Sequence, residues 1–352
     1  AVAAYQRAVA IDPSRAAPWS RLADAYRKLE RYNEARNAYQ QSIELDGLLP
    51  DPYYGLGIIE LTANRYPAAI DNFTKAISRF GPDQQPQQAL AWNGLGDVYR
   101  LQQNFSGAVD AYQQAIDLDG SLSESYHGLG LVYTSTGQFE PAITQFQQAL
   151  ERYPAGAAAD TDRAVVWTDL GETYGIVQRW ESAVEAYQRA IELGSDLARP
   201  WFKLGDLYRV TGQPEDAIKA YRAAVDLDAD FAWVYNNMGL VHQQQQETAQ
   251  AEAAFQQAIE RHSQAVDQAT SWYNLGDVYL AQNQLDDARH AFEQSIKLKP
   301  DFARPWKGLG DVYRAQGRAD GVTEAYQRAI VLDSHYAWPS HSVGAIYKNQ
   351  GA

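Results

Sequence analysis

The sequence predicts an all-α solenoid, a stack of antiparallel helical hairpins, and three observations indicate this fold class. In residues 92–119 the apolar residues follow one helix face twice, first at Trp92, Leu95, Gly96 and Tyr99, then at Ala108, Tyr112, Ala115 and Ile116. The stretch between these halves, QQNFSG, is short enough only for a tight turn. The same pattern then recurs along the chain, because such a hairpin needs copies of itself to bury its apolar faces.

Each copy begins with a residue that we call the anchor. The anchors are Trp19, Tyr53, Trp92, Tyr126, Trp167, Trp201, Tyr235, Trp272, Trp306 and, in a weaker copy, Ser340. Subtracting neighbouring positions gives intervals of 34, 39, 34, 41, 34, 34, 37, 34 and 34 residues. Gly stands four residues after the anchor in nine of the ten copies, and Tyr stands seven after it in eight of the ten. We expect these small residues to make space for the rings of neighbouring helices.

Helix boundaries follow from Pro and Gly. Pro precedes five anchors by one residue, inside the first helical turn, where its missing N–H is harmless. Gly47, Gly81 and Gly120 end second helices. We expect one solenoid domain over 1–352, with nine full repeats in 16–336. Residues 1–15 match only a second helix and residues 337–352 only a first helix, so we expect a fragment of a longer protein.

The pattern resembles the tetratricopeptide repeat (TPR) family over essentially the whole chain. Residues 272–300 carry it nearly intact, in Trp272, Leu275, Gly276, Tyr279, Ala288, Phe292 and Pro300. The resemblance implies a right-handed superhelix whose first helices line a concave groove. It also implies an interaction scaffold, which says little about the partner because such folds serve many pathways.

The net charge and the composition limit the kinds of partner that the chain is expected to bind. The formal net charge is −14, which disfavours nucleic acid and anionic membranes and favours a protein or extended peptide with basic or apolar residues. No apolar run is long enough for a transmembrane helix. The chain has no Cys, which excludes disulfides and thiol chemistry. The compartment stays open, with the cytoplasm favoured.

Three connections between repeats are longer than the others, near residues 81–90, 154–165 and 261–270. The copies before them share an apolar residue five after the anchor and an Arg late in the second helix, namely Arg79, Arg152 and Arg261. Features that occur together indicate duplicated blocks of repeats. Drift in loop length is the alternative, since surface loops tolerate it.

No residue pattern indicates catalysis, and we expect no enzyme activity, cofactor or metal. The GxG triplets starting at Gly55, Gly94, Gly128 and Gly308 lie inside predicted helices and follow no strand, so they are not phosphate loops. The six His residues show no metal-ligand spacing. No Ser-His-Asp set or carboxylate pair is indicated.

Charged pairs recur on the first helices, five and eight residues after the anchor. They include Asp97 with Arg100, Asp206 with Arg209 and Asp311 with Arg314. Each pair either neutralises itself within its helix or contributes to a ladder of charges that hydrogen-bonds an extended peptide.

Aromatic and amide residues gather in copies 6 to 8, outside the repeat pattern, at Phe202, Trp233, Tyr273, Asn236, Asn237 and Asn274. Rings supply buried area at small entropic cost and amides pair with a peptide backbone, so we expect a binding surface. Packing between adjacent helices is the alternative.

The sequence thus predicts a non-catalytic protein- or peptide-binding scaffold. One alternative is a sensory or regulatory arm of a larger signalling ATPase or glycosyltransferase. Another is head-to-tail self-association through the half-hairpins at the ends. The family's carboxylate clamp is not indicated, because Asp311 follows Lys307 by four residues. The asparagine ladder of its sugar-transferring members is not indicated either, since only Asn237 and Asn274 hold the required position.

Overall fold

The computed structural model describes residues 1–154, 156–194 and 196–333, apart from the side chains of residues 157, 158 and 320. Regular structure in these residues is helical throughout, which confirms the all-α prediction. The first unit contains α1 (Val2–Ile11), α2 (Ala16–Arg27), α3 (Tyr32–Leu45), α4 (Pro50–Thr62), α5 (Tyr66–Ile77), a 3-10 turn η1 (Pro82–Gln84), α6 (Gln85–Leu101), α7 (Phe105–Leu118), α8 (Ser123–Ser135), α9 (Phe139–Arg152), α10 (Ala157–Ile176) and α11 (Trp180–Leu193). The second contains α12 (Ala198–Val210), α13 (Pro214–Leu227), α14 (Ala232–Gln244), α15 (Thr248–Arg261), α16 (Ala265–Ala281), α17 (Leu285–Leu298), α18 (Ala303–Ala315) and α19 (Ala319–Leu332).

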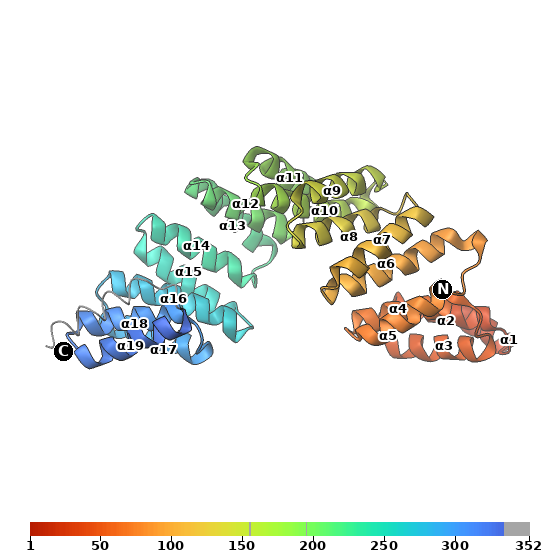
Figure 1. Ribbon diagram of the computed structural model, residues 1–352, viewed down its shortest axis with the longest axis horizontal. Coiled ribbons are helices and arrows are strands. Elements are labelled where there is room, and N and C mark those ends of the chain that lie inside the picture. Colours follow the sequence, from red (N-terminus) through yellow and green to blue (C-terminus); the bar gives the residue numbers. More distant parts are fainter. Residues whose placement is uncertain (155, 195, 334–352) are drawn as a thin grey trace. The chain divides into compact units, whose positions relative to one another are not determined.

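The chain divides into two compact units, Ala1–Gly194 and Ser195–Ala352, and the described residues of each form a stack of hairpins in sequence order (Figure 1). From α2 onward, each even-numbered first helix packs against the odd-numbered second helix that follows it. Within a unit, consecutive first helices also contact one another, as α2 does α4 and α14 does α16. The first helices therefore form one surface of each unit, which we call the first-helix face. The second helices form the opposite, second-helix face.

Rings from the second helices fill the space beside helical Gly residues, as expected. A Cβ on Gly96 would lie 2.7 Å from the ring of Tyr112, and a Cβ on Gly128 in the next hairpin would lie 2.4 Å from it. Gly130 in turn faces Phe146 of its own hairpin. The two Gly residues of a GxG triplet thus contact the rings of two consecutive hairpins. This packing locks neighbouring repeats together and accounts for the triplets without a phosphate site.

The anchors tie each repeat to the connector before it. The indole N–H groups of Trp19 and Trp306 donate to the carbonyls of Pro13 and Pro300, six residues upstream, at 3.0 and 3.2 Å. Anchors that are Tyr use the hydroxyl in the same way, at Tyr53, Tyr126 and Tyr235.

The late Arg residues pack on these Tyr anchors. Arg152 stacks over Tyr126 with its guanidinium carbon 4.1 Å from the ring centroid, and its Nε donates to the Gly120 carbonyl at 2.9 Å. Arg79 and Arg261 repeat both contacts with their own anchors. These three copies precede the long connections, so a shared set of contacts distinguishes them from the rest.

The long connections mainly extend the first helices that follow them. Helices α6 and α16 have 17 residues and α10 has 20, whereas α4, α8, α12, α14 and α18 have 13. The single-domain count, the repeat boundaries and the duplicated blocks stay predictions. The half-repeat expected at 337–352 lies outside the described residues.

Candidate binding site on the first-helix face

The charged pairs of the first helices bond to a Tyr of the second helix. Tyr112 donates its hydroxyl proton to Asp97 Oδ1 at 2.7 Å, and Arg100 Nε donates to the Tyr112 hydroxyl oxygen at 3.2 Å. Arg100 Nη2 also lies 3.5 Å from Asp97 Oδ1. Burial, with the nearby Asp97 charge, raises the pKa of Tyr112 above its ordinary value. The hydroxyl therefore stays protonated and able to donate.

The same arrangement recurs in both units. Tyr221 donates to Asp206 at 2.7 Å, and Tyr326 donates to Asp311 at 2.6 Å. Arg209 and Arg314 lie 4.0 and 3.1 Å from these carboxylates. Asp311 also binds Lys307 Nζ at 2.7 Å. The pairs thus belong to hydrogen-bond networks inside the repeat, which agrees with the interpretation that each pair serves its own helix. Their role as a charge ladder for a peptide stays a prediction.

A sequence signal for these networks was missed. The ring twenty residues after the anchor is Tyr where the residue five after the anchor is acidic, and Phe where that residue is apolar, as in Leu131 with Phe146. The exception is Asp277, whose copy carries Phe292. Asp277 instead accepts a hydrogen bond from Tyr273, and burial raises its pKa.

The aromatic residues of copies 6 to 8 are half-buried and pack on neighbouring rings. The Phe202 centroid lies 4.8 Å from that of Phe231, and the Tyr273 centroid lies 5.5 Å from that of Phe302. Trp233 stands edge-on to His262 of the long connection, with centroids 4.9 Å apart. The rings therefore contact helix neighbours and keep part of their surface exposed.

The three Asn residues are brought together in a buried network. Asn236, Asn237 and Asn274 are 2%, 9% and 8% exposed. Asn237 Nδ2 donates to Asp206 Oδ1 at 2.6 Å, Asn236 Nδ2 donates to Asn237 Oδ1 at 3.1 Å, and Asn274 Nδ2 donates to Asn236 Oδ1 at 3.0 Å. Polar atoms in this network satisfy one another across α12, α14 and α16, which fixes the register of three repeats.

A cleft of about 240 Å³ opens on the first-helix face of unit 1. Its lining residues are Arg21, Asp24, Arg27, Lys28, Asp51, Tyr54, Phe80, Gln87 and Leu90. The apolar part combines Tyr54 with Phe80 and with Leu90, which is 38% exposed. Leu90 and Gln87 come from the long connection at 81–90, so the lengthened α6 supplies one wall.

Charges surround this apolar part. Arg21 lies 3.5 Å from both Asp24 and Asp51. Burial raises the pKa of Asp51 above its usual value. Lys28 is exposed and makes no ion pair within the described residues. The cleft thus offers an apolar floor with acidic and basic groups at its edges.

The described residues hold no group of three or more His, Cys, Asp and Glu side chains placed to bind a metal ion. None of the helices in the described ranges is both long enough and apolar enough to cross a membrane.

Stacked hairpins with two such faces define the class of helical-repeat scaffolds. The chain belongs to the tetratricopeptide repeat family. Family models described as tetratricopeptide or TPR repeats match residues 14–80 and 230–301, 54–122 and 273–337, 171–212, 205–246, and 123–155. No curated protein sequence matches the chain significantly.

Solved structures show the same fold. PilF of Pseudomonas aeruginosa is 19% identical, over 63% of this chain and 97% of its own, with a TM-score of 0.52. A chain of the APC/C hetero-tetramer Cut9–Hcn1 is 12% identical, over 98% of this chain and 92% of its own, also with a TM-score of 0.52. The protein MamA is 26% identical over 51% of this chain and 95% of its own, with a TM-score of 0.44. The likenesses to PilF and to the Cut9–Hcn1 chain, with TM-scores above 0.5, show the fold alone, and the partner is inferred from this chain's own residues.

Proposed function

We propose that the chain is a non-catalytic scaffold that binds an extended peptide or a peptide-like segment of a protein along its first-helix face. The observation that carries this proposal is the unit 1 cleft, where apolar rings and charges of both signs surround one space of about 240 Å³. Such a site suits an apolar side chain flanked by a polar backbone.

The cleft has a complementary group for each part of a peptide. An apolar side chain would enter between Tyr54, Phe80 and Leu90. Asp24 and Asp51 would accept hydrogen bonds from backbone N–H groups or from a basic residue, and Lys28 would pair with a carbonyl or a carboxylate.

In unit 2 the proposed contacts are the exposed parts of Phe202, Trp233 and Tyr273. Asp277 joins them as the acceptor for a basic residue. Its carboxylate lacks the second-helix Tyr that binds the equivalent Asp in four other copies. A basic partner agrees with the net charge of −14.

A library of random linear peptides selected on the full chain tests the proposal. Leu90→Glu places a charge on the apolar wall of the cleft, so we expect selected peptides to bind that variant about tenfold more weakly, roughly 1.4 kcal/mol. Val331→Glu is the matched control, because Val331 is an exposed apolar residue on α19, far from the lining residues in sequence.

Unit 2 is tested with Phe202, Trp233 and Tyr273 changed together to Ala. We expect lost binding of the peptides that select unit 2, with the helical circular dichroism retained. Peptides that bind Leu90→Glu and the triple variant as tightly as the native chain would refute binding on the first-helix face.

A further inference from the structure

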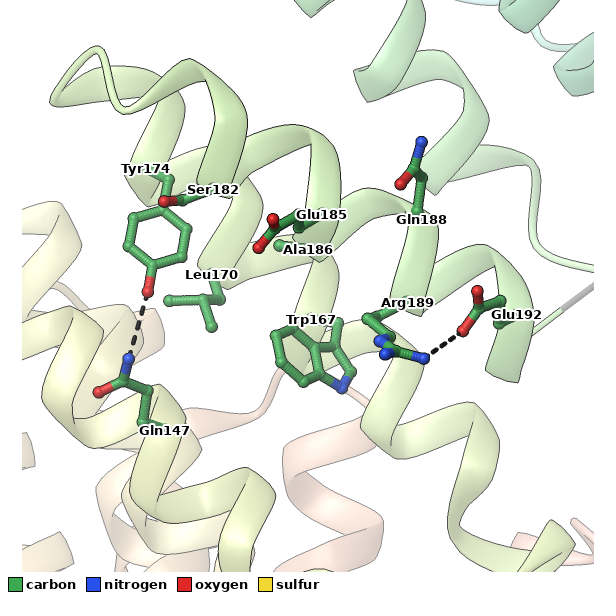
Figure 2. Close-up of a pocket in the computed structure, with 10 residues that line it drawn as sticks. All are labelled: Gln147, Trp167, Leu170, Tyr174, Ser182, Glu185, Ala186, Gln188, Arg189 and Glu192. Atoms are coloured by element: carbon green, nitrogen blue, oxygen red, sulfur yellow. Dashed lines mark hydrogen bonds and ion pairs between the residues drawn. The ribbon is translucent and has the colours of Figure 1, made fainter.

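A second cleft, of about 510 Å³, lies on the opposite, second-helix face of unit 1 (Figure 2). It runs between α9 and α11, with α10 at its floor. Figure 2 shows Tyr174 bonded to Gln147 at one end and Arg189 paired with Glu192 at the other, with Trp167 and Leu170 between them. Its floor is therefore aromatic and aliphatic, while its rim is polar.

An equivalent cleft of about 290 Å³ lies in unit 2, between α15 and α17. Trp272, Leu275 and Tyr279 hold the positions that Trp167, Leu170 and Tyr174 hold in unit 1. The end contact is repeated as well, since Gln256 Nε2 lies 3.5 Å from the Tyr279 hydroxyl. The two units thus share the indole, the Leu and the Tyr–Gln contact, while the position of Glu185 in unit 1 is taken by His290 in unit 2.

Both clefts follow a long connection, and this has a physical consequence for the anchor. After short connectors, Trp19 and Trp306 donate to a connector carbonyl. In α10 and α16 the residues upstream of the anchor are helical, so their carbonyls are used within the helix. Trp167 and Trp272 make no hydrogen bond through the indole within the described residues, and their half-buried rings line the clefts. The His290 ring stands edge-on to Trp272, with the ring centroids 6.0 Å apart.

The charge at both rims is acidic. Two carboxylates and one guanidinium line the unit 1 cleft, while Glu260 and Asp287 line the unit 2 cleft with no Lys or Arg. Glu185 and Asp287 are exposed and have no ion-pair partner within the described residues. A cleft that combines aromatic rings with an unpaired carboxylate attracts a cation, because the ring faces and the carboxylate act in the same direction.

We propose that these two clefts bind arginine side chains of a partner polypeptide. The planar guanidinium lies over the aromatic floor and pairs with Glu185 in unit 1 or with Asp287 in unit 2, and the methylene stem covers the adjacent Leu. The site is separate from the first-helix face, so it adds a second docking surface that is independent of the function proposed above.

Nuclear magnetic resonance of the full chain tests the proposal through the indole N–H signals, with Trp167 and Trp272 assigned from their Phe variants. The probe is the peptide acetyl-Gly-Arg-Gly-amide, and its control carries citrulline, which has the same shape without the charge. We expect the arginine peptide to shift both indole signals. The citrulline peptide should bind at least about fivefold more weakly.

Charge reversal separates the clefts from general attraction to an acidic protein. Glu185→Lys should weaken binding at Trp167 about fivefold while leaving Trp272 unchanged, and Asp287→Lys should do the reverse. The controls Asp117→Lys and Asp226→Lys alter exposed acidic residues that line neither cleft. Equal binding of both peptides, equal effects of all four variants, or unshifted Trp167 and Trp272 signals would each overturn the proposal.

Discussion

Changing Tyr112 to Phe removes the hydroxyl that donates to Asp97 Oδ1 at 2.7 Å. A hydrogen bond to a charged group contributes about 1.5–3 kcal/mol net. The Asp97 side chain is 33% exposed, so water replaces part of the loss, and we expect a cost of about 1–2 kcal/mol. Asp97→Leu should cost a similar amount, because Tyr112 then keeps only its contact with Arg100.

The double variant should cost less than the sum of the two single changes. It recreates the pairing of Leu131 with Phe146 that copy 4 already has. With both partners apolar, neither Asp97 nor Tyr112 leaves the other polar group buried alone, while Arg100 loses both contacts in the double variant, and we expect a coupling energy of about 1 kcal/mol. Tyr99→Phe is the control, because the Tyr99 hydroxyl makes no hydrogen bond within the described residues.

Native-state hydrogen exchange of the α6 and α7 amides is the suitable assay, since a stack of repeats opens locally and exchange reports the stability of this one hairpin. If the free-energy costs of the two single substitutions simply add up in the double variant, the internal network is refuted. If the single variants instead left exchange unchanged and weakened only peptide binding, Asp97 and Arg100 would be binding residues, as the alternative from the sequence holds.

Two further predictions concern buried positions. Glu60 is ion-paired with Arg65 and Arg36, whose hydrogen bonds lower its pKa below the ordinary value of a glutamate. A carboxyl group whose pKa is lower in the folded than in the unfolded state stabilises the protein at pH values above the unfolded-state pKa. This stabilisation is lost as the pH falls through the folded-state pKa. Glu60→Gln should therefore be about 1–3 kcal/mol less stable at pH 7, and urea titrations should show that difference shrinking below about pH 4.5; a constant difference would contradict it. Gly128→Ala should destabilise by about 1–3 kcal/mol because its Cβ would meet the Tyr112 ring, whereas Gly175→Ala, with open space around it, should be neutral or stabilising; equal melting shifts would count against this packing.

The hairpins were predictable from the sequence because their signals lie within one repeat. The spacing of Trp92, Leu95 and Tyr99 defines a helix face without knowledge of any neighbour. The bond between Asp97 and Tyr112 also lies within one repeat, and comparing copies would have found it.

The asparagine network and the clefts were not predictable in this way. Asn236 bonds to Asn237 beside it and to Asn274, 38 residues away, so its role depends on how closely α14 and α16 approach. In the sequence alone, Asn residues outside the repeat pattern cannot be distinguished from residues that contact a ligand. The anchors Trp167 and Trp272 fit the pattern of the other core positions, and only the lengthened helices before them reveal that they line clefts.

The contacts of the Tyr anchors bear on the origin of the long connections. A change in the length of the following loop does not by itself favour Arg152 over Leu. The Arg contacts Tyr126 and the connector upstream of its own repeat, and these lie before the long connection in the sequence. The three copies nevertheless share the Tyr anchor, the Arg and the apolar residue five after the anchor. The Arg stacks on the Tyr anchor, so these two features are linked by contact, whereas the apolar residue five after the anchor occurs with a Phe twenty after it. The two sets would occur together in the same three copies if a block were copied as a unit, and duplicated blocks stay the hypothesis to test against the sequences of further repeats.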